Sequence, residues 1–487
     1  MVFSSLEFLY LFFPLCMLAY FLAKSVGTKN TVLILFSLVF YAWGEPVYVF
    51  LMIGTIFADY LFGLAIERTR TGKYGKLVLA LGVAVNLASL VLFKYAGFLL
   101  EIVNGIFGTK FAATGLSMPI GISFYTFQAL SYLVDVYRAD VKAQHQPHKL
   151  LLYVSMFPQL IAGPIVRYQQ IANEIDCRTT TPIDVSMGID RFIVGLAKKV
   201  IFANAVGQMA STYLDQQDLT KVPALAAWFA LTMYALQIYF DFSAYSDMAI
   251  GMGRMLGFHF LENFNYPYLS TSITEFWRRW HMSLGTFFRD YVYIPLGGNR
   301  CSKGRHIFNM FIVWFLTGLW HGASWNYVLW GLYFFVFLVL EKYVYGKFLE
   351  KHGIFAHIYF LILVVFGWSL FYYRDLGRLG TLIGSLFGAH GVGIHDTLFW
   401  EYFRSNGLMV IVACIGATPV LQLLKKLYVY VCSIGRVTQP DGTVAYTTRV
   451  PATIAYIVKG VALAALLLIC TSLLVGQTFN PFIYFNF

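Results

Sequence analysis

Long runs of apolar residues, separated by short polar stretches, recur along the whole chain. Many of them approach the ~20 residues that an α-helix needs to cross the hydrocarbon core of a bilayer. The pattern predicts an all-α polytopic membrane protein with about eleven spans, some of them half-spans or re-entrant and interfacial helices. The expected spans are 6–23, 31–43, 47–66, 77–103, 118–136, 148–166, 188–211, 222–252, the two segments flanking His321, 355–373, 407–427 and 453–475.

One apolar run carries a histidine near its middle. Between Ile307 and Leu340 there is no Asp, Glu, Lys or Arg, and His321 is the ionisable residue inside. The run is too long for one span, so we expect a helix, a break at Thr317–Asn326 and a second helix. Irregular backbone at membrane depth is tolerated where it faces protein or a water-filled cavity. An ionisable residue there marks a functional site, and imidazole exchanges a proton near neutral pH. The alternative is that His321 caps a buried helix end.

The composition leaves no room for a large soluble domain. Of 487 residues, 59% are hydrophobic and 12% charged, about half the usual ~25% of a soluble protein. The longest candidate pieces outside the membrane are roughly 139–150, 173–187, 213–221, 268–306 and 433–450.

We therefore treat residues 1–487 as one membrane domain. It comprises N-terminal spans at 1–138, a core with the re-entrant and site motifs at 139–345, and C-terminal spans at 346–487. A turn is expected at Gln439–Gly442, and the aromatic ending Phe479–Phe487 fits the membrane interface.

The net charge of +11 reflects basic residues in short loops rather than nucleic-acid binding. The loop Glu67–Lys76 is expected to face the cytoplasm, as the positive-inside rule requires. Lys24 and Lys29 mark an earlier loop of the same sign, which places the N-terminus outside. Met1–Glu7 carries no Lys or Arg, so a cleavable signal peptide is not indicated.

A second unusual segment, Glu275–Arg300, interleaves cations with aromatic residues. Its charges favour an amphipathic helix at the membrane surface. Arginines there either hold an anionic headgroup, a pyrophosphate or a carrier-protein acid, or anchor the chain at the interface. His281 within it is equally well read as structural or functional.

Two further polar features lie in apolar runs. Asp241 and Asp247 form either a proton relay or a polar helix–helix clasp. The clasp is favoured because Ser243, Tyr245 and Ser246 offer local partners. The segment Phe157–Tyr168 holds two prolines, and it is expected to be a re-entrant or broken helix lining a cavity, with a kinked span as the alternative.

The sequence contains no motif for several other kinds of catalytic or binding site. There is no Walker-type phosphate loop and no H-E-x-x-H helix, and the six cysteines are scattered without a CxxC pair. His145 and His148 lie in a loop without further ligands, so no metal site is predicted. No internal repeat of the kind found in many transporters is visible.

Four long segments in order give the chain a specific resemblance to a known family. It resembles the membrane-bound O-acyltransferase (MBOAT) family, and within it the bacterial branch that O-acetylates polysaccharides such as alginate. The matching stretches are Phe157–Tyr168, Tyr239–Phe258, Glu275–Arg300 and Leu316–Gly331, joined by Tyr41–Gly44 and the aromatic C-terminus.

The resemblance implies a funnel-shaped helical protein with a buried histidine in a tunnel across the membrane. The family's essential histidine corresponds to His321 and its second recurrent histidine to His281. Candidate substrate-binding residues are Trp320, Asn326, Arg289, Asp290 and Tyr293.

The expected reaction follows from this resemblance and from imidazole chemistry. Acetyl-CoA or an acyl-carrier thioester donates from the cytoplasm, no cofactor is bound, and His321 takes the acceptor's hydroxyl proton. Asn326, Trp325 or a backbone N–H at the break holds the oxyanion, and an acyl-histidine intermediate stays open.

The expected setting is the bacterial cytoplasmic membrane. The expected acceptor is a cell-surface polysaccharide, a teichoic acid, or an extracytoplasmic acetyltransferase partner protein that passes the group onward. A related branch transfers D-alanine from a carrier protein toward teichoic acids, but Tyr291–Arg300 and the chain length favour the acetyl branch. A proton-coupled transporter and a non-catalytic scaffold remain the competing hypotheses.

Overall fold

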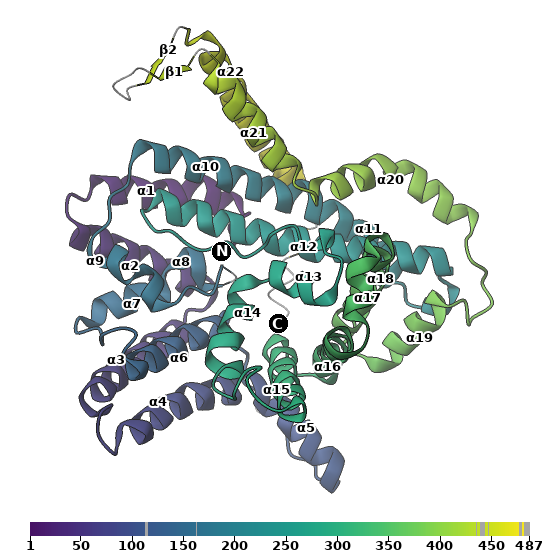
Figure 1. Ribbon diagram of the computed structural model, residues 1–487, viewed down its shortest axis with the longest axis horizontal. Helices are drawn as coiled ribbons and strands as arrows, with labels where there is room; N and C mark the ends of the chain where they lie inside the picture. Colours follow the sequence, from purple (N-terminus) through teal and green to yellow (C-terminus); the bar gives the residue numbers. More distant parts are fainter. Residues whose placement is uncertain are drawn as a thin grey trace. The chain divides into compact units, whose positions relative to one another are not determined.

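The structure, a computed structural model, describes residues 1–112, 115–161, 163–434, 436–438, 444–446, 448–476 and 480–481. It is helical apart from one short antiparallel hairpin (Figure 1). The elements of its first part are η1 (Phe8–Phe12), α1 (Phe13–Leu22), α2 (Val26–Gly44), α3 (Tyr48–Thr69), α4 (Gly75–Leu90), η2 (Val91–Tyr95), α5 (Ala96–Phe107), α6 (Ile122–Arg138), α7 (Pro147–Ser155), α8 (Phe157–Leu160), α9 (Tyr168–Asp176), α10 (Pro182–Ala197), η3 (Lys198–Ala203), α11 (Asn204–Leu214), η4 (Leu219–Lys221) and α12 (Ala224–Met255).

The remaining elements follow the 3-10 turn η5. They are η5 (Pro267–Leu269), α13 (Ile273–Arg279), α14 (Met282–Phe288), η6 (Arg289–Tyr293), α15 (Lys303–His321), α16 (Trp325–Leu340), η7 (Glu341–Tyr345), α17 (Gly346–Lys351), α18 (Gly353–Tyr372), α19 (Leu376–Leu386), α20 (Thr397–Gly416), α21 (Val420–Ser433), β1 (Arg436–Thr438), β2 (Val444–Tyr446) and α22 (Val450–Gly476).

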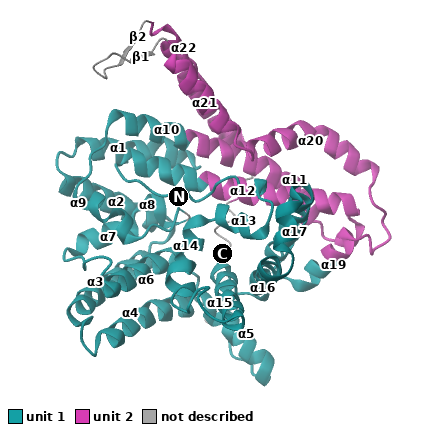
Figure 2. Ribbon diagram, viewed as in Figure 1, with its two compact units in different colours: residues 1–192, 245–381, 482–487 teal, residues 193–244, 382–481 magenta. Residues whose placement is uncertain are grey.

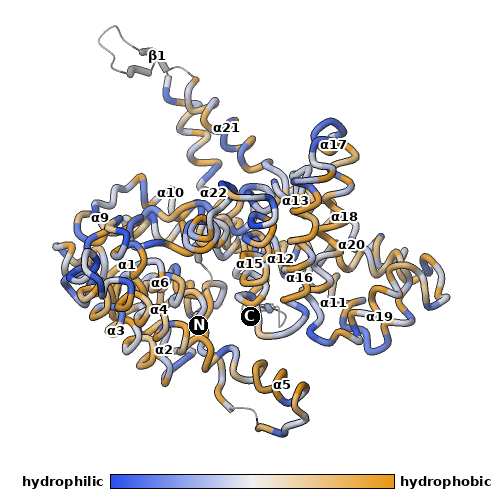
Figure 3. The backbone as a smooth tube through the Cα atoms, turned by 60° about the horizontal axis from the view of Figure 1, so that its bottom comes forward, coloured by the Kyte–Doolittle hydropathy of each residue, from blue (hydrophilic) through white to orange (hydrophobic). Residues whose placement is uncertain are grey.

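Within these described residues, nine helical segments are long and apolar enough to cross a membrane. Figure 3 shows hydrophobic colour along most of their length and hydrophilic colour gathered in the connections. The prediction of a polytopic helical membrane protein is therefore confirmed. The segments are Val26–Gly44, Tyr48–Thr69, Gly75–Phe107, Pro182–Leu214, Ala224–Met255, Trp325–Lys351, Gly353–Tyr372, Thr397–Gly416 and Val450–Gly476.

The double-proline segment breaks the chain as expected. Helix α7 ends at Ser155, Met156 leaves helical geometry at ψ 112°, and α8 is a single turn that begins beside Pro158. A proline near the start of a helix costs no hydrogen bond, whereas one inside would remove a backbone donor. The broken helix is confirmed, and the alternative of a kinked continuous span is wrong.

One predicted span, 407–427, is wrong in its bounds. Helix α20 starts earlier because Asp396 caps it, accepting a hydrogen bond from Phe399 N at 2.7 Å. It ends at Gly416, and Pro419 separates it from α21. The turn predicted at Gln439–Gly442 and most of the aromatic ending lie outside the described residues.

The break beside His321 is shorter than predicted. Helix α15 continues to His321, and Gly322–Ser324 alone separate it from α16. Close packing of the two helices keeps the preceding turn helical. A Cβ on Gly318 would lie 2.4 Å from Tyr327 O, and one on Gly331 would lie 2.4 Å from Trp314 O. Only glycines allow this approach, which is the usual device at helix crossings in membranes.

The segment Glu275–Arg300 is not one amphipathic helix, so that prediction is wrong. It forms α13 and α14, joined at Trp280–His281, and then the π-helical turn η6. His281 has φ 44° and ψ 53°, a left-handed conformation that ends one helix and begins the next. Most apolar side chains of the two short helices are buried, so tertiary packing overrides the surface pattern. They are Ile273, Phe276, Leu284, Phe287 and Phe288.

Contacts divide the chain into two compact units, coloured in Figure 2. Unit 1 contains residues 1–192, 245–381 and 482–487, and therefore both candidate histidines. Unit 2 contains residues 193–244 and 382–481.

The two membrane aspartates hold helices together, as the clasp hypothesis expects, but through cations. In unit 2, Asp241 Oδ1 lies 2.6 Å from Lys199 Nζ, and both side chains are buried. In unit 1, Asp247 Oδ1 lies 2.7 Å from Arg191. The expectation of local Ser and Tyr partners missed these ion pairs because they join residues 42 and 56 positions apart.

Candidate active site

His321 ends helix α15 inside an aromatic enclosure, with 6% of its surface exposed. Its ring centroid lies 4.9 Å from Trp320, 4.9 Å from Trp330 and 5.3 Å from Phe371. These rings come from α15, α16 and α18. They exclude water from the imidazole on several sides, which strengthens electrostatic interactions there.

The indole of Trp320 links the two candidate histidines. Its ring contacts His321 and also His281, at 5.7 Å between centroids. Trp320 is held in turn by Phe124 at 5.3 Å and Phe127 at 5.7 Å, both on α6. The two histidines, 40 residues apart in sequence, therefore share one rigid neighbour.

His281 is 1% exposed and sits at the junction between α13 and α14. A left-handed conformation costs a non-glycine residue of order 1–3 kcal/mol and persists only where surroundings impose it. Here Met282 N donates to Asn263 O at 3.0 Å, which fixes the junction. Strain of this kind concentrates at functional sites.

A hydrogen-bond network sets the protonation of the His281 ring. Asn263 Oδ1 accepts from Ser283 N at 3.1 Å and from Ser283 Oγ at 2.9 Å, and it lies 3.2 Å from His281 Nδ1. The backbone N–H of Ser283 is a donor only, so the Asn263 atom is the oxygen. His281 Nδ1 must then carry the hydrogen, which leaves the lone pair of the neutral ring on Nε2.

The network joins two segments that the sequence singled out. Ser283 Oγ, besides donating to Asn263, accepts a hydrogen bond from Ile165 N at 3.0 Å. Ile165 follows Gly163 and Pro164 in the broken-helix segment. The segments Phe157–Tyr168 and Glu275–Arg300 thus meet at His281.

Two side chains from the turn η2 cap the end of the His321 helix. Lys94 Nζ donates to Trp320 O at 2.5 Å, and Tyr95 Oη donates to Leu319 O at 2.7 Å. Carbonyls in the last turn of a helix lack intrahelical partners, and a cation there also suits the helix dipole. Sequence reasoning missed both residues. The available signal was Lys94 itself, the lone charge of residues 77–100.

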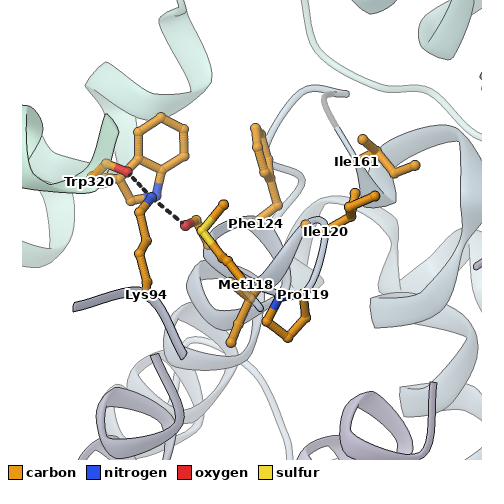
Figure 4. Close-up of a pocket in the computed structure, with 10 residues that line it drawn as sticks. Lys94, Met118, Pro119, Ile120, Phe124, Ile161 and Trp320 are labelled. Atoms are coloured by element: carbon orange, nitrogen blue, oxygen red, sulfur yellow. Dashed lines mark hydrogen bonds between the residues drawn. The ribbon is translucent and has the colours of Figure 1, made fainter. Parts of the chain in front are cut away.

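A cavity of about 50 Å³ adjoins this cap (Figure 4). That is room for a few water molecules. Lys94 and Trp320 form one side, and residues 118–124 and Ile161 form the rest. Lys94 Nζ also donates to Ser123 Oγ at 2.9 Å on the cavity wall.

Two buried indole donors beside His321 lack acceptors. Within the described part of the chain, the Nε1 atoms of Trp320 and Trp330 have no hydrogen-bond partner. A buried donor without a partner costs roughly 1–3 kcal/mol, so such a group calls for an explanation. A transient negative charge beside the imidazole would supply the missing acceptor.

The residues flanking the helix break face different ways. Asn326 is fully buried, and its Nδ2 donates to Leu370 O at 3.1 Å, tying α16 to α18. Trp325 is 52% exposed and contacts the ring of Phe98.

The remaining predicted binding residues lie together on η6. Arg289 and Asp290 form an ion pair at 2.7 Å, and Asp290 Oδ2 lies 2.8 Å from Arg167. Burial raises the pKa of the Asp290 carboxyl, but hydrogen bonds from Arg289 and Arg167 outweigh it and lower that pKa overall. Tyr293 Oη lies 2.7 Å from His306 Nε2.

Comparison with known proteins identifies close relatives. Residues 138–376 match the family model MBOAT, described as the membrane-bound O-acyltransferase family. The probable alginate O-acetylase AlgI of Pseudomonas putida is 37% identical over 509 residues, covering 100% of both chains. That of Pseudomonas aeruginosa is 44% identical over 350 residues, covering 70% of this chain and 66% of the relative. The peptidoglycan O-acetyltransferase of Helicobacter pylori is 31% identical over 463 residues, covering 87% of each.

Proposed function

This chain belongs to the membrane-bound O-acyltransferase family, and from that premise we propose that it moves an acetyl group from a cytoplasmic thioester to a hydroxyl of a cell-surface polysaccharide. The enzyme is a multi-pass membrane acyltransferase, as its family and its apolar helices establish. The observation that carries the proposal is His321, a buried imidazole at the break between α15 and α16.

The proposed reaction uses His321 as general base. Its neutral ring takes the proton of the acceptor hydroxyl, and the oxygen attacks the thioester carbonyl. The tetrahedral intermediate then collapses, the carbon–sulfur bond breaks, and the imidazolium returns its proton to the departing thiolate. General base assistance contributes typically ~10²–10⁴ in rate.

The negative charge on the carbonyl oxygen needs donors in place before the reaction. The indoles of Trp320 and Trp330 both contact His321, and their N–H groups lack acceptors within the described residues. We assign them this role in preference to Asn326, whose amide already donates to Leu370 O, and to the outward-facing Trp325.

His281 supplies a second imidazole that can exchange a proton, and its ring contacts the same indole, Trp320. With Nδ1–H held by Asn263, its Nε2 is the nitrogen that can accept a proton. A neutral base fixed in one tautomer is ready to exchange protons without reorganising.

The acceptor, the donor and the setting complete the proposal. The names of the relatives favour a polysaccharide, reached directly or through an extracytoplasmic partner protein. The donor is acetyl-CoA or an acyl-carrier thioester, and the protein resides in the bacterial cytoplasmic membrane with its N-terminus outside. D-alanyl transfer from a carrier protein is the alternative within the same family.

Transfer of radiolabelled acetyl from acetyl-CoA in proteoliposomes tests the proposal. His321→Ala and His321→Gln should abolish thioester turnover. His148→Ala, which changes an exposed histidine in the first turn of α7, should match the wild type. Unchanged turnover in both His321 variants would refute its role as base. If the wild type turns over an acyl-carrier thioester but not acetyl-CoA, the donor assignment changes and the enzyme class stands.

A further inference from the structure

A buried lysine, Lys94, contacts the backbone of the candidate site. It lies outside every segment on which the family resemblance rests. Lys94 lies on η2, is 8% exposed, and is the one charged residue in the stretch from Leu77 to Leu100. Holding a lysine among apolar helices is costly, and such residues mark functional positions.

Two neutral oxygens accept hydrogen bonds from the Lys94 ammonium group. Its nitrogen donates to Trp320 O and Ser123 Oγ, and no carboxylate in the described chain pairs with it. It also lies 5.9 Å from the centroid of the Trp320 ring, which favours a cation. A lysine kept merely for stability would be expected to have an acidic partner, as Lys199 does in unit 2.

The acceptor of Lys94 is the peptide group that joins Trp320 to His321. A hydrogen bond to Trp320 O fixes the plane of that peptide, and this plane directs the Cα–Cβ bonds of both residues. The Lys94 nitrogen donates to both Trp320 O and Ser123 Oγ, and dashed lines in Figure 4 mark its hydrogen bonds. The contact therefore acts on the base and on the indole at once.

The geometry points to Lys94 as a positioning residue, which sets the orientation of Trp320 and His321 through the carbonyl between them. This role requires no contact between Lys94 and the acyl donor or the hydroxyl that receives the acyl group. A displacement of about 1 Å at a reacting group can cost about 100-fold in rate. Removing the contact should therefore lower kcat and leave the KM for the donor nearly unchanged.

A variant of the neighbouring Tyr95 distinguishes a positioning role of Lys94 from simple capping of the helix end. Its hydroxyl caps the same helix end one residue earlier, at Leu319 O. Tyr95→Phe removes a cap without releasing the Trp320–His321 peptide. Ser123→Ala removes the other acceptor of Lys94 and leaves Trp320 O engaged.

The kinetic arm rests on the proposed function. Lys94→Met should lower kcat for acetyl transfer about 10- to 100-fold with KM within about twofold. Tyr95→Phe and Ser123→Ala should retain most of the kcat. Equal losses in Lys94→Met and Tyr95→Phe, or a loss confined to KM, would overturn the positioning role.

A second experiment, chemical labelling of the histidines, does not depend on acyl transfer activity. Diethyl pyrocarbonate modifies accessible imidazoles, and mass spectrometry reports His321 and His306 separately. His306 is 3% exposed at the other end of α15, so it reports general loosening of that helix. Lys94→Met should raise His321 modification about tenfold over His306, because a buried carbonyl is left unpaired. An unchanged ratio would overturn the inference.

The kinetic and the labelling experiments also distinguish failure of the proposed function from failure of the proposed role of Lys94. A wild type that transfers no acyl group refutes the function, while the labelling ratio still decides the role of Lys94. If Lys94→Met fails to accumulate in membranes, Lys94→Gln replaces it. Its shorter amide cannot reach both acceptors, so weaker changes in the same direction are expected, and wild-type behaviour overturns the inference.

Discussion

His281 Nδ1 lies 3.2 Å from Asn263 Oδ1, an oxygen that also accepts two hydrogen bonds from Ser283. This contact holds the hydrogen of the His281 ring on Nδ1 and leaves Nε2 as the nitrogen that can accept a proton. Asn263→Leu keeps the volume and removes the acceptor, so it should lower acetyl transfer about 100-fold, the lower end of the range for a proton-transfer group.

The matched control for this change is Asn265→Leu, an exposed residue of the same loop. It should transfer acetyl at the wild-type rate in proteoliposomes. Full activity in Asn263→Leu would show that the tautomer of His281 has no part in turnover.

Replacing Trp330 by Phe removes an indole N–H next to His321 and keeps an aromatic ring in the enclosure. Loss of one oxyanion donor costs about 10²–10³ in kcat where measured in other enzymes, so a large fall in kcat is expected. Trp325→Phe, on the same helix but half exposed, should be neutral. If both variants give the same kcat in the radiolabel assay, the donor role of Trp330 is wrong.

The crossing of α15 and α16 depends on the absence of side chains. Gly318→Ala places a Cβ 2.4 Å from Tyr327 O and should destabilise the protein by about 1–3 kcal/mol, the usual cost of overpacking. Gly304→Ala on the same helix meets no atom within 4 Å and should be neutral or slightly stabilising. Thermal unfolding in one detergent compares the two, and equal midpoints would contradict the close crossing.

In unit 2, Lys199→Met should destabilise the protein by about 3–5 kcal/mol because it leaves the Asp241 carboxylate buried without its cation. Lys199→Met with Asp241→Leu should recover most of that loss. Lys221→Met, which breaks an exposed pair with Asp218, is the control and should change little.

Acetyl transfer by the Lys199–Asp241 double variant also tests the proton-relay hypothesis. A clasp requires only that the helices stay together, so transfer should persist once stability is recovered. A stable double variant without turnover would favour the relay.

The ion pairs of Asp290 predict that the stability of the folded protein depends on pH. Because its folded-state pKa lies below the ordinary value, the carboxylate adds stability above about pH 4, and this contribution disappears as the pH falls through the folded-state value. The unfolding midpoint of Asp290→Asn should be lower than that of the wild type at pH 7. The gap should close below about pH 4, and a gap that is constant with pH would refute the assignment.

Apolar run lengths and the interruption by His321 were enough to predict the membrane class and the helix–break–helix. They fixed neither the short break nor the split of Glu275–Arg300 into two helices. Those details depend on Gly318 meeting Tyr327 and on the junction held by Asn263, which are contacts between distant positions. Periodicity reports which face of a helix is apolar and cannot report which partner covers it.

The candidate site, too, could be predicted only in part from the sequence. His321 and His281 could be identified from the sequence because each stands in an unusual segment, and Trp320 became a candidate through the family resemblance. Lys94 was visible as a lone charge in an apolar run, yet only the fold reveals that its acceptor is Trp320 O, 226 positions away. Asn263 carried no signal of its own, because its importance lies in its contacts with His281 and Ser283. Trp330 lies in a stretch that matches the family, but the sequence does not show that its ring lies against His321.

Helix α22 has 27 residues, and only 6% of its most apolar stretch is buried by the rest of the protein. At 1.5 Å per residue it is about 40 Å long, while the hydrocarbon core of a typical bilayer is about 30 Å thick. The excess has to be absorbed by tilt or by local thickening of the lipid. Lipid chain length is thus a physical variable for this helix, and thin and thick bilayers would hold it at different angles.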